Sequence, residues 1–274
     1  MKVILFDIDG TLIKAGGAGL RALNRAVKEM CGVDDVCSRF KLQGSTDKTN
    51  FKNAFISAFK RKPSRREIIL LEKKYIKYLP EEIENSIRNK RYEKIRGIEK
   101  LLKVLAGRKN VSVGLGTGNL KQGAFIKLKP SGFLKYFAFG GFGCDSAVRS
   151  RVIKKAVKRA ERVLKRKISP LGVYVVGDTH LDVIAAKQAG YHSGAVLDGF
   201  GDEKEIMKNS PEIVQKDFRN ILPWLIWLGL KKDPKGVKRG TYICPDTPIE
   251  HAHFGRTGLD SRGMNAGREK ENGR

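Results

Sequence analysis

Two acidic residues directly follow the first apolar segment of the chain. Residues 3–6 are all apolar, which predicts a strand buried on both faces, and Asp7 and Asp9 stand where that strand ends. Ligands of open α/β sheets bind at the carboxyl ends of the strands, so two carboxylates two residues apart at this point can share one site. Gly10 can then turn the backbone sharply away. The alternative is a strand end that carries two solvated acids.

Polar residues follow two later apolar segments in the same way. Residues 111–115 predict a second buried strand, and it ends in Gly116-Thr117-Gly118-Asn119. A threonine flanked by glycines, between a strand and a helix, presents a hydroxyl and backbone N–H groups to an anion. Residues 173–176 predict a third strand, and Asp178 and Asp182 follow it. A fourth strand is expected at residues 192–197.

The long segment after the first strand predicts only helices. Apolar residues at three- and four-residue spacing indicate a helix that ends at Gly32, and a second helix carries three phenylalanines four residues apart. A capping box at Ser64 and Glu67 opens a third helix, which should stop before Pro80. A further helix is expected from Glu81 to about Tyr92.

These motifs, in this order, resemble those of a known family. Asp7-Ile-Asp9-Gly10-Thr11 resembles the first motif of the haloacid dehalogenase superfamily, Asp-x-Asp-x-Thr. Thr117 between its glycines resembles the second motif, and Gly177-Asp178 with Asp182 resembles the fourth, Gly-Asp-x-x-x-Asp. The resemblance covers roughly residues 1–228. It implies a doubly wound α/β fold with a parallel sheet and a helical cap inserted after the first motif.

The resemblance also implies a role for each motif residue. Asp7 would be the nucleophile that accepts a phosphoryl group, and Asp9 the general acid and base that protonates the leaving oxygen and then activates water. Thr117 would bind the phosphoryl group, with Gly118 and Asn119 beside it at the substrate. A carboxylate attacks a phosphate dianion poorly, so this chemistry needs a metal ion as well as a second acid. The expected ion is Mg²⁺, held by Asp7, Asp9, Asp178 and Asp182, since few carboxylates plus water and substrate suit it.

The third motif of the family requires a lysine or arginine, and here the resemblance is weakest. The usual Lys-Pro signature is missing, and the candidates are Arg149 and, in reserve, Arg151. The alternative interpretation of each arginine is that it is one of many surface cations on a basic helix. His180 is expected to be an exposed loop residue or a substrate contact rather than a metal ligand.

The predicted domain organisation is a core with one insertion. Residues 1–14 and 94–230 should form the catalytic core, residues 15–93 the helical cap, and residues 231–274 a disordered tail without an apolar face. A cap of this kind excludes water from phosphoryl transfer and supplies side chains that select the substrate. The cap, the glycine-rich stretch at residues 16–19 and residues 116–119 together are most similar to phosphoglycolate phosphatase-like members.

Composition limits the classes of function only in part. The chain has 274 residues, no apolar run long enough to span a bilayer, and four cysteines without metal-ligand spacing, so a cytoplasmic protein with reduced cysteines is expected. The formal net charge of +26 would attract phosphorylated metabolites, nucleic acid or acidic membranes alike. Because no nucleic-acid-binding module or aromatic platform is recognisable, a nucleic-acid partner is not the favoured interpretation, and neither is a membrane.

The favoured function is a Mg²⁺-dependent phosphoric monoester hydrolase. Its substrate would be a small phosphorylated metabolite, such as a phosphoglycolate-like compound, a sugar phosphate or a nucleotide. Asp9 argues for phosphoryl chemistry, because the dehalogenating branch of the family does not keep an acid at that position. A sugar-phosphate mutase with the same motifs is the first alternative. A phosphatase that acts on nucleic acid, or binds it, is the second.

Overall fold

The structure is a computed structural model that describes residues 1–40 and 44–232 and the backbone of residues 242–243. The prediction of a disordered tail at residues 231–274 therefore falls almost wholly outside the described residues. Within that range, Tyr242–Ile243 form a short strand. No helix in the described part of the chain combines the length and the hydropathy needed to cross a membrane.

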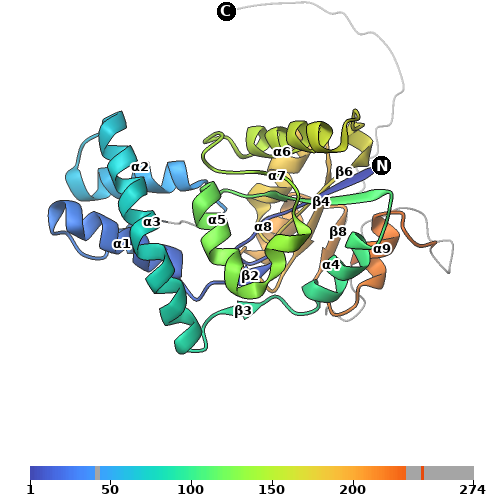
Figure 1. Ribbon diagram of the computed structural model, residues 1–274, viewed down its shortest axis with the longest axis horizontal. Coiled ribbons are helices and arrows are strands. Elements are labelled where there is room, and N and C mark those ends of the chain that lie inside the picture. Colours follow the sequence, from blue (N-terminus) through green and yellow to red (C-terminus); the bar gives the residue numbers. More distant parts are fainter. Residues whose placement is uncertain (41–43, 233–241, 244–274) are drawn as a thin grey trace, which may run out of the picture. The chain divides into compact units, whose positions relative to one another are not determined.

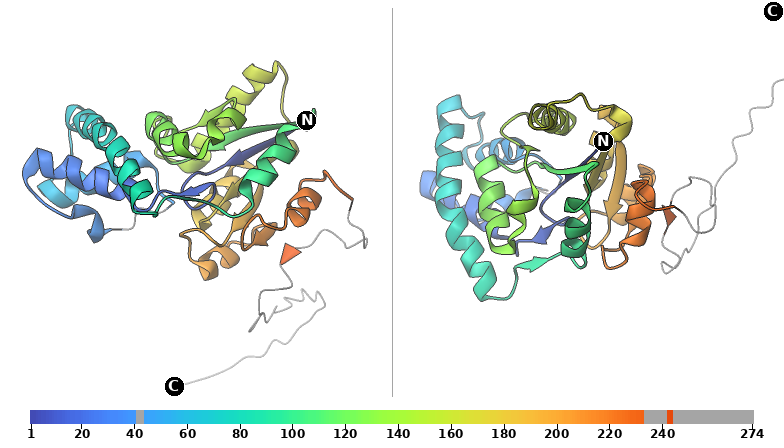
Figure 2. Two further views of the ribbon diagram at one scale, coloured as in Figure 1. Left: turned by 60° about the horizontal axis from the view of Figure 1, so that its bottom comes forward. Right: turned by 45° about the vertical axis from the view of Figure 1, so that its right-hand side comes forward.

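A parallel sheet organises the core (Figures 1 and 2). Its strand order is β5-β4-β1-β6-β7-β8-β9, with every neighbouring pair parallel. The strands, in chain order, are β1 (Lys2–Phe6), β4 (Val111–Gly116), β5 (Gly140–Gly141), β6 (Val173–Gly177), β7 (His192–Val196), β8 (Ile213–Gln215) and β9 (Tyr242–Ile243). The predicted α/β fold with a parallel sheet is confirmed, and the four predicted strands are all present.

Helices cover both faces of this sheet. Successive side chains of a strand point to opposite faces, and on the central strands both sets are apolar. Ile4 and Phe6 belong to the larger core cluster, whereas Val3 and Leu5 belong to a second cluster with residues of α6 and α7. Burial on both faces is the reason for the unbroken apolar run of β1. The core helices are α4 (Ile98–Ala106), α5 (Lys121–Leu128), α6 (Arg149–Leu164), α7 (His180–Ala189), α8 (Glu203–Lys208) and α9 (Leu222–Trp227), with single 3₁₀ turns at η2 (Lys129–Ser131), η3 (Phe133–Tyr136) and η4 (Pro170–Gly172).

In its described residues, the inserted segment contains three helices and one 3₁₀ turn. They are α1 (Ala18–Cys31), η1 (Val36–Arg39), α2 (Asp47–Phe59) and α3 (Arg65–Arg88). Figure 1 shows α1, α2 and α3 as one helical group. Glu82 of α3, only 5% exposed, holds α1 through ion pairs of 2.7 Å to Arg21 and 2.8 Å to Arg25. The predicted capping box of Ser64 and Glu67 is present, and Thr46 caps α2.

The prediction that a helix stops before Pro80 is wrong. Pro80 lies inside α3, which continues to Arg88. Leu79 and Ile83, on either side of Pro80, are both buried, so the helix keeps its apolar contacts across the proline. Pro80 itself is exposed, so its ring lies on the water-facing side of α3. Packing of the buried face outweighs the local cost of the proline.

The chain enters and leaves the insertion through two adjacent strands. β2 (Ile13–Lys14) precedes α1, β3 (Glu93–Lys94) follows α3, and the two pair antiparallel, Ile13 opposite Lys94. An ion pair of 3.1 Å joins Lys14 to Asp198, which follows β7. The helical insertion is thus tied to the sheet region by a two-stranded ribbon at the predicted domain boundaries.

Candidate active site

The predicted motif residues lie together at the carboxyl edge of the sheet. Asp7 follows β1, Thr117 follows β4 and Asp178 follows β6, and these are three neighbouring strands. The amide of Asp7 continues the ladder by donating to the carbonyl of Val176 at 3.0 Å. Parallel strands end on the same side, so the strand order alone brings residues far apart in sequence into one site.

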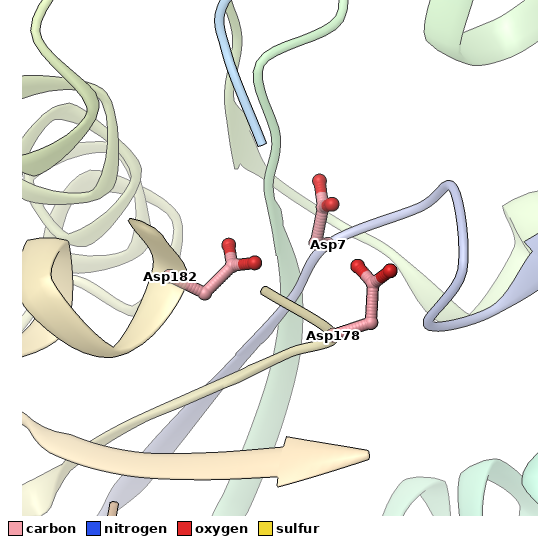
Figure 3. Close-up of side chains that lie close together, drawn as sticks. All are labelled: Asp7, Asp178 and Asp182. Atoms are coloured by element: carbon pink, nitrogen blue, oxygen red, sulfur yellow. The ribbon is translucent and has the colours of Figure 1, made fainter. Parts of the chain in front are cut away.

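Three buried carboxylates face a common space (Figure 3). Each of Asp7, Asp178 and Asp182 offers an oxygen, and these oxygens all lie within 4.8 Å of one another. Burial raises the pKa of Asp7 to about 6; Arg149 opposes this rise, while the charges of Asp182 and Asp9 add to it. Burial, together with Asp182 and Asp7, also raises the pKa of Asp178 well above its ordinary value. The cluster therefore concentrates negative charge that its protein surroundings leave only partly compensated.

Asp178 is fixed by the loops around it. One of its oxygens accepts a hydrogen bond from the Thr11 hydroxyl at 3.3 Å, and the other accepts the backbone N–H of Phe200 at 2.8 Å. Gly10 has a φ of +79°, and a Cβ there would lie 2.1 Å from a carboxylate oxygen of Asp178. Gly10 therefore provides both the turn and the space for this acid.

Arg149, the first candidate for the third motif, lies between two of the clustered acids. Its side chain is 9% exposed, and Nη2 lies 3.0 Å from Oδ1 of Asp7 and 2.5 Å from Oδ1 of Asp182. Its Nη1 donates to the carbonyl of Gly44 at 3.0 Å. Arg151, the reserve candidate, is exposed. The two arginines differ in the direction of their side chains. Arg149, the first residue of α6, reaches the acids, whereas Arg151, two residues later in the same turn, faces solvent.

Asp182 is occupied by protein partners on both oxygens. Oδ2 accepts from the hydroxyl and backbone N–H of Thr179, which is the capping box of α7, and Oδ1 accepts from Nε of Arg149 at 2.9 Å. Asp182 is thus placed to orient Arg149. His180, the first residue of α7, is half-buried.

The Thr117 motif forms a compact polar turn beside Asp7. The Thr117 hydroxyl oxygen accepts from the backbone N–H of Asn119 at 3.2 Å and from its side-chain amide at 2.9 Å. A Cβ on Gly118 would lie 2.4 Å from the carbonyl oxygen of Ser45, so only glycine lets the insertion approach here. Gly118 and Asn119 line the cavity described below, whereas Thr117 is fully buried.

Asp9 has a partner that none of the sequence motifs predicts. Lys127 of α5, 6% exposed, lies 2.6 Å from Oδ2 of Asp9 and donates to Oδ1 of Asn119 at 2.6 Å, and Asn119 also donates to Oδ2 of Asp9 at 2.9 Å. Burial would lower the pKa of Lys127, but Asp9, Tyr75 and Asp47 together raise it. The only sequence signal was a lysine at residue 127 that falls on the same helical face as Ala124 and Leu128.

A cavity of about 210 Å³ opens over these groups. Its core side includes Asp7, Asp9, Arg149 and Asp178, and its opposite side comes from the inserted helices and the residue 44–47 loop. Asp47 ties the two sides together, because its carboxylate accepts the backbone N–H of Leu120 at 2.7 Å and its own N–H donates to Gly118 at 2.8 Å. Burial raises the pKa of Asp47 to about 6, an effect that Lys127 opposes.

The carboxylate cluster suits a divalent cation held by hard oxygen ligands. Oδ1 of Asp7 is buried and, among the described residues, has no hydrogen-bond partner, since Arg149 lies within ion-pair distance but not in hydrogen-bonding geometry. Burial raises the pKa of both Asp7 and Asp178 in this cluster. Asp9 is not one of the three clustered acids and instead binds Lys127. Its place among the metal ligands stays a prediction.

The chain was compared with known proteins. The family model of the haloacid dehalogenase-like hydrolases matches residues 4–196. Comparison with curated proteins gives no match. Similar solved structures include a haloacid dehalogenase-like family hydrolase from Streptococcus pneumoniae (19% identity, 82% of this chain and 98% of that chain, TM-score 0.57). A predicted phosphoglycolate phosphatase from Haemophilus somnus is similar over 82% of this chain and 97% of its own (18% identity, TM-score 0.58).

A β-phosphoglucomutase from Clostridium difficile is also similar, with 17% identity, 83% of this chain and 96% of that chain covered, and a TM-score of 0.63. At these identities the structural similarity shows the fold alone. The family match is stronger evidence, because it spans most of the described core and includes every motif residue from Asp7 to Asp182. This chain belongs to the family of haloacid dehalogenase-like hydrolases.

Proposed function

We propose that this hydrolase is a Mg²⁺-dependent phosphatase that cleaves a small phosphate monoester through an aspartyl-phosphate on Asp7. The observation that carries the proposal is the cluster of Asp7, Asp178 and Asp182 around Arg149, with Asp9 two residues beyond the nucleophile. Mg²⁺ held by Asp7 and Asp178 would neutralise charge on the phosphoryl group as it meets the carboxylates.

The first step would transfer the phosphoryl group to the protein. A carboxylate oxygen of Asp7 attacks phosphorus, the bond between phosphorus and the alcohol oxygen breaks, and the proton on Asp9 goes to that oxygen. Arg149 balances charge at Asp7 and is itself oriented by Asp182. Lys127 and Asn119 both bind Oδ2 of Asp9, which leaves Oδ1 to carry the proton.

The second step would release phosphate. Asp9, now a carboxylate, takes a proton from water as the water oxygen attacks phosphorus, and the bond to Asp7 breaks. The products are inorganic phosphate and free Asp7, with Asp9 protonated again. The inserted helices limit access of bulk water to the cavity, so that a single positioned water suffices.

Phosphate release from a panel of monoesters in Mg²⁺, comparing wild type with Asp7→Asn and Asp9→Asn, tests this function. Asp7→Asn should abolish turnover without loss of the fold, and Asp9→Asn should be severely impaired yet form some phosphoenzyme from a good leaving group. If both variants were as active as the wild type, the proposed mechanism would be refuted. Isomerised sugar phosphate in place of free phosphate would identify a mutase instead.

A further inference from the structure

The cavity has two walls of different chemistry. The core wall carries the acids, Arg149 and Lys127. The wall from the inserted segment is mainly apolar, with Leu20, Leu23, Phe51 and Tyr75 facing the cavity, and its polar side chains Ser45 and Asn50 are uncharged. Phe51 and Tyr75 pack edge to face, with ring centroids 5.1 Å apart, and both are nearly fully buried. Since the phosphoryl group belongs at the acids, this second wall contacts the alcohol part of the substrate.

No lysine or arginine of the inserted segment lines the cavity, as far as the described residues go. Asp47 lies on that wall and adds an acid instead. Among the described residues, the two cations that line the cavity, Arg149 and Lys127, come from the core. Arg149 already binds Asp7, Asp182 and the Gly44 carbonyl, and Lys127 binds Asp9 and Asn119 at 2.6 Å each. Both cations are therefore already paired, and neither is available to bind a second anionic group of the substrate.

An anion without a partner is costly to place against such a wall. Moving a carboxylate from water to an apolar surface is strongly unfavourable unless it is paired. The cavity is also small: its volume of about 210 Å³ lies below the roughly 300 to 1,000 Å³ of typical ligand pockets. That space suits a phosphoryl group with a short organic group better than it suits a nucleotide.

From this geometry we infer, building on the proposed phosphatase activity, that the site selects phosphate monoesters of small uncharged alcohols with an apolar face. It should discriminate against monoesters whose alcohol carries a carboxylate or a second phosphate. Phosphoglycolate, the substrate class suggested by resemblance, is then a poor substrate. Phe200, from the loop that holds Asp178, adds a half-exposed ring to the core side of the same cavity.

Matched substrates test this inference directly. Propyl phosphate and phosphoglycolate differ mainly by the carboxylate, and glycerol 3-phosphate and 3-phosphoglycerate form a second pair. The kcat/KM should be at least tenfold higher for the uncharged member of each pair. The assays belong at about 0.15 M salt, where screening limits the attraction that the charge of +26 exerts on every anion.

One substitution should reverse the preference. Leu20 lines the cavity and is 37% exposed, so Leu20→Lys can place an ammonium at the apolar wall without burying it fully. It should shift the ratio of kcat/KM values at least tenfold toward phosphoglycolate. Leu20→Met keeps the wall apolar, and Ile69→Lys adds the same charge to an exposed α3 position that does not line the cavity. Ile69→Lys should leave the ratio unchanged, and Leu20→Met should change it far less than Leu20→Lys does.

The outcomes separate this inference from the proposed function. Phosphate release that is lost in Asp7→Asn, but is as fast with phosphoglycolate as with propyl phosphate, would overturn the substrate class alone. An unchanged ratio in Leu20→Lys would do the same. If neither these monoesters nor para-nitrophenyl phosphate released any phosphate, the proposed function and the substrate class would both be refuted.

Discussion

Replacing the proposed nucleophile should stabilise the metal-free protein. Burial raises the pKa of Asp7 from an ordinary 3.8 to about 6, so the folded state disfavours its charged form. The stability linked to this carboxyl is fully present below pH 3.8 and is lost as the pH rises through 6. At 1.36 kcal/mol for each pH unit, the loss at pH 8 is about 3 kcal/mol.

Asp7→Asn removes that loss, because the amide is nearly isosteric and stays uncharged. The variant loses the ion pair between Asp7 and Arg149, although Arg149 keeps its ion pair with Asp182. The expected gain in the free energy of unfolding at pH 8 is therefore about 1 to 3 kcal/mol, with little or no gain at pH 4. For a chain of this size, a gain of that order raises Tm by several degrees.

Urea unfolding in excess EDTA at pH 4, 6 and 8 measures this difference. Asp34→Asn is the matched control, because Asp34 is exposed and pairs only with the exposed Lys28 among the described residues. Its free energy of unfolding should change by less than about 0.5 kcal/mol at each pH. A variant at residue 7 that is less stable than wild type at pH 8, or equally shifted at all three pH values, would refute the electrostatic reasoning.

Three further predictions concern activity. Chelation by EDTA should abolish turnover, and Asp178→Ala should strongly raise the Mg²⁺ concentration for half-maximal activity; full activity in EDTA would contradict this. Lys127→Met should lower kcat/KM at least tenfold for alkyl phosphates and less for aryl phosphates, because it disturbs the acid Asp9. Lys121→Met, on the exposed face of α5, should have no such effect. Added salt should reduce kcat/KM moderately with kcat nearly constant, while submicromolar DNA binding with a steep salt dependence and no phosphate release would favour a nucleic-acid partner.

The strands and their terminal motifs could be predicted because they depend on local patterns. An apolar run followed by an acid or a threonine marks a buried strand and its carboxyl end, and Asp7, Thr117 and Asp178 all follow this rule. Helix ends at Gly32 and Ser64 were predicted from caps for the same reason. Such signals need only a few neighbouring residues.

The features that escaped prediction depend on contacts between distant segments. Lys127 is one of many lysines in the sequence, and only the position of α5 in the fold brings it to Asp9, 118 residues away. Local sequence predicts a helix end before Pro80, because the packing of α3 on α1 cannot be seen locally. Residues 149 and 151 are both arginine, and only the orientation of α6 decides which of them reaches Asp7.

The ribbon of β2 and β3 has a consequence for the order of folding. β1 pairs with β4 across about 105 intervening residues, but once Ile13 and Lys94 are paired the open loop shortens to about 25 residues. The entropic cost of joining β1 to β4 then falls by about 1 kcal/mol. We therefore expect the inserted helices and their ribbon to form before the central strands meet. Substitutions of Leu71 in α3 should slow refolding, whereas substitutions of Val214 in β8 should mainly speed unfolding.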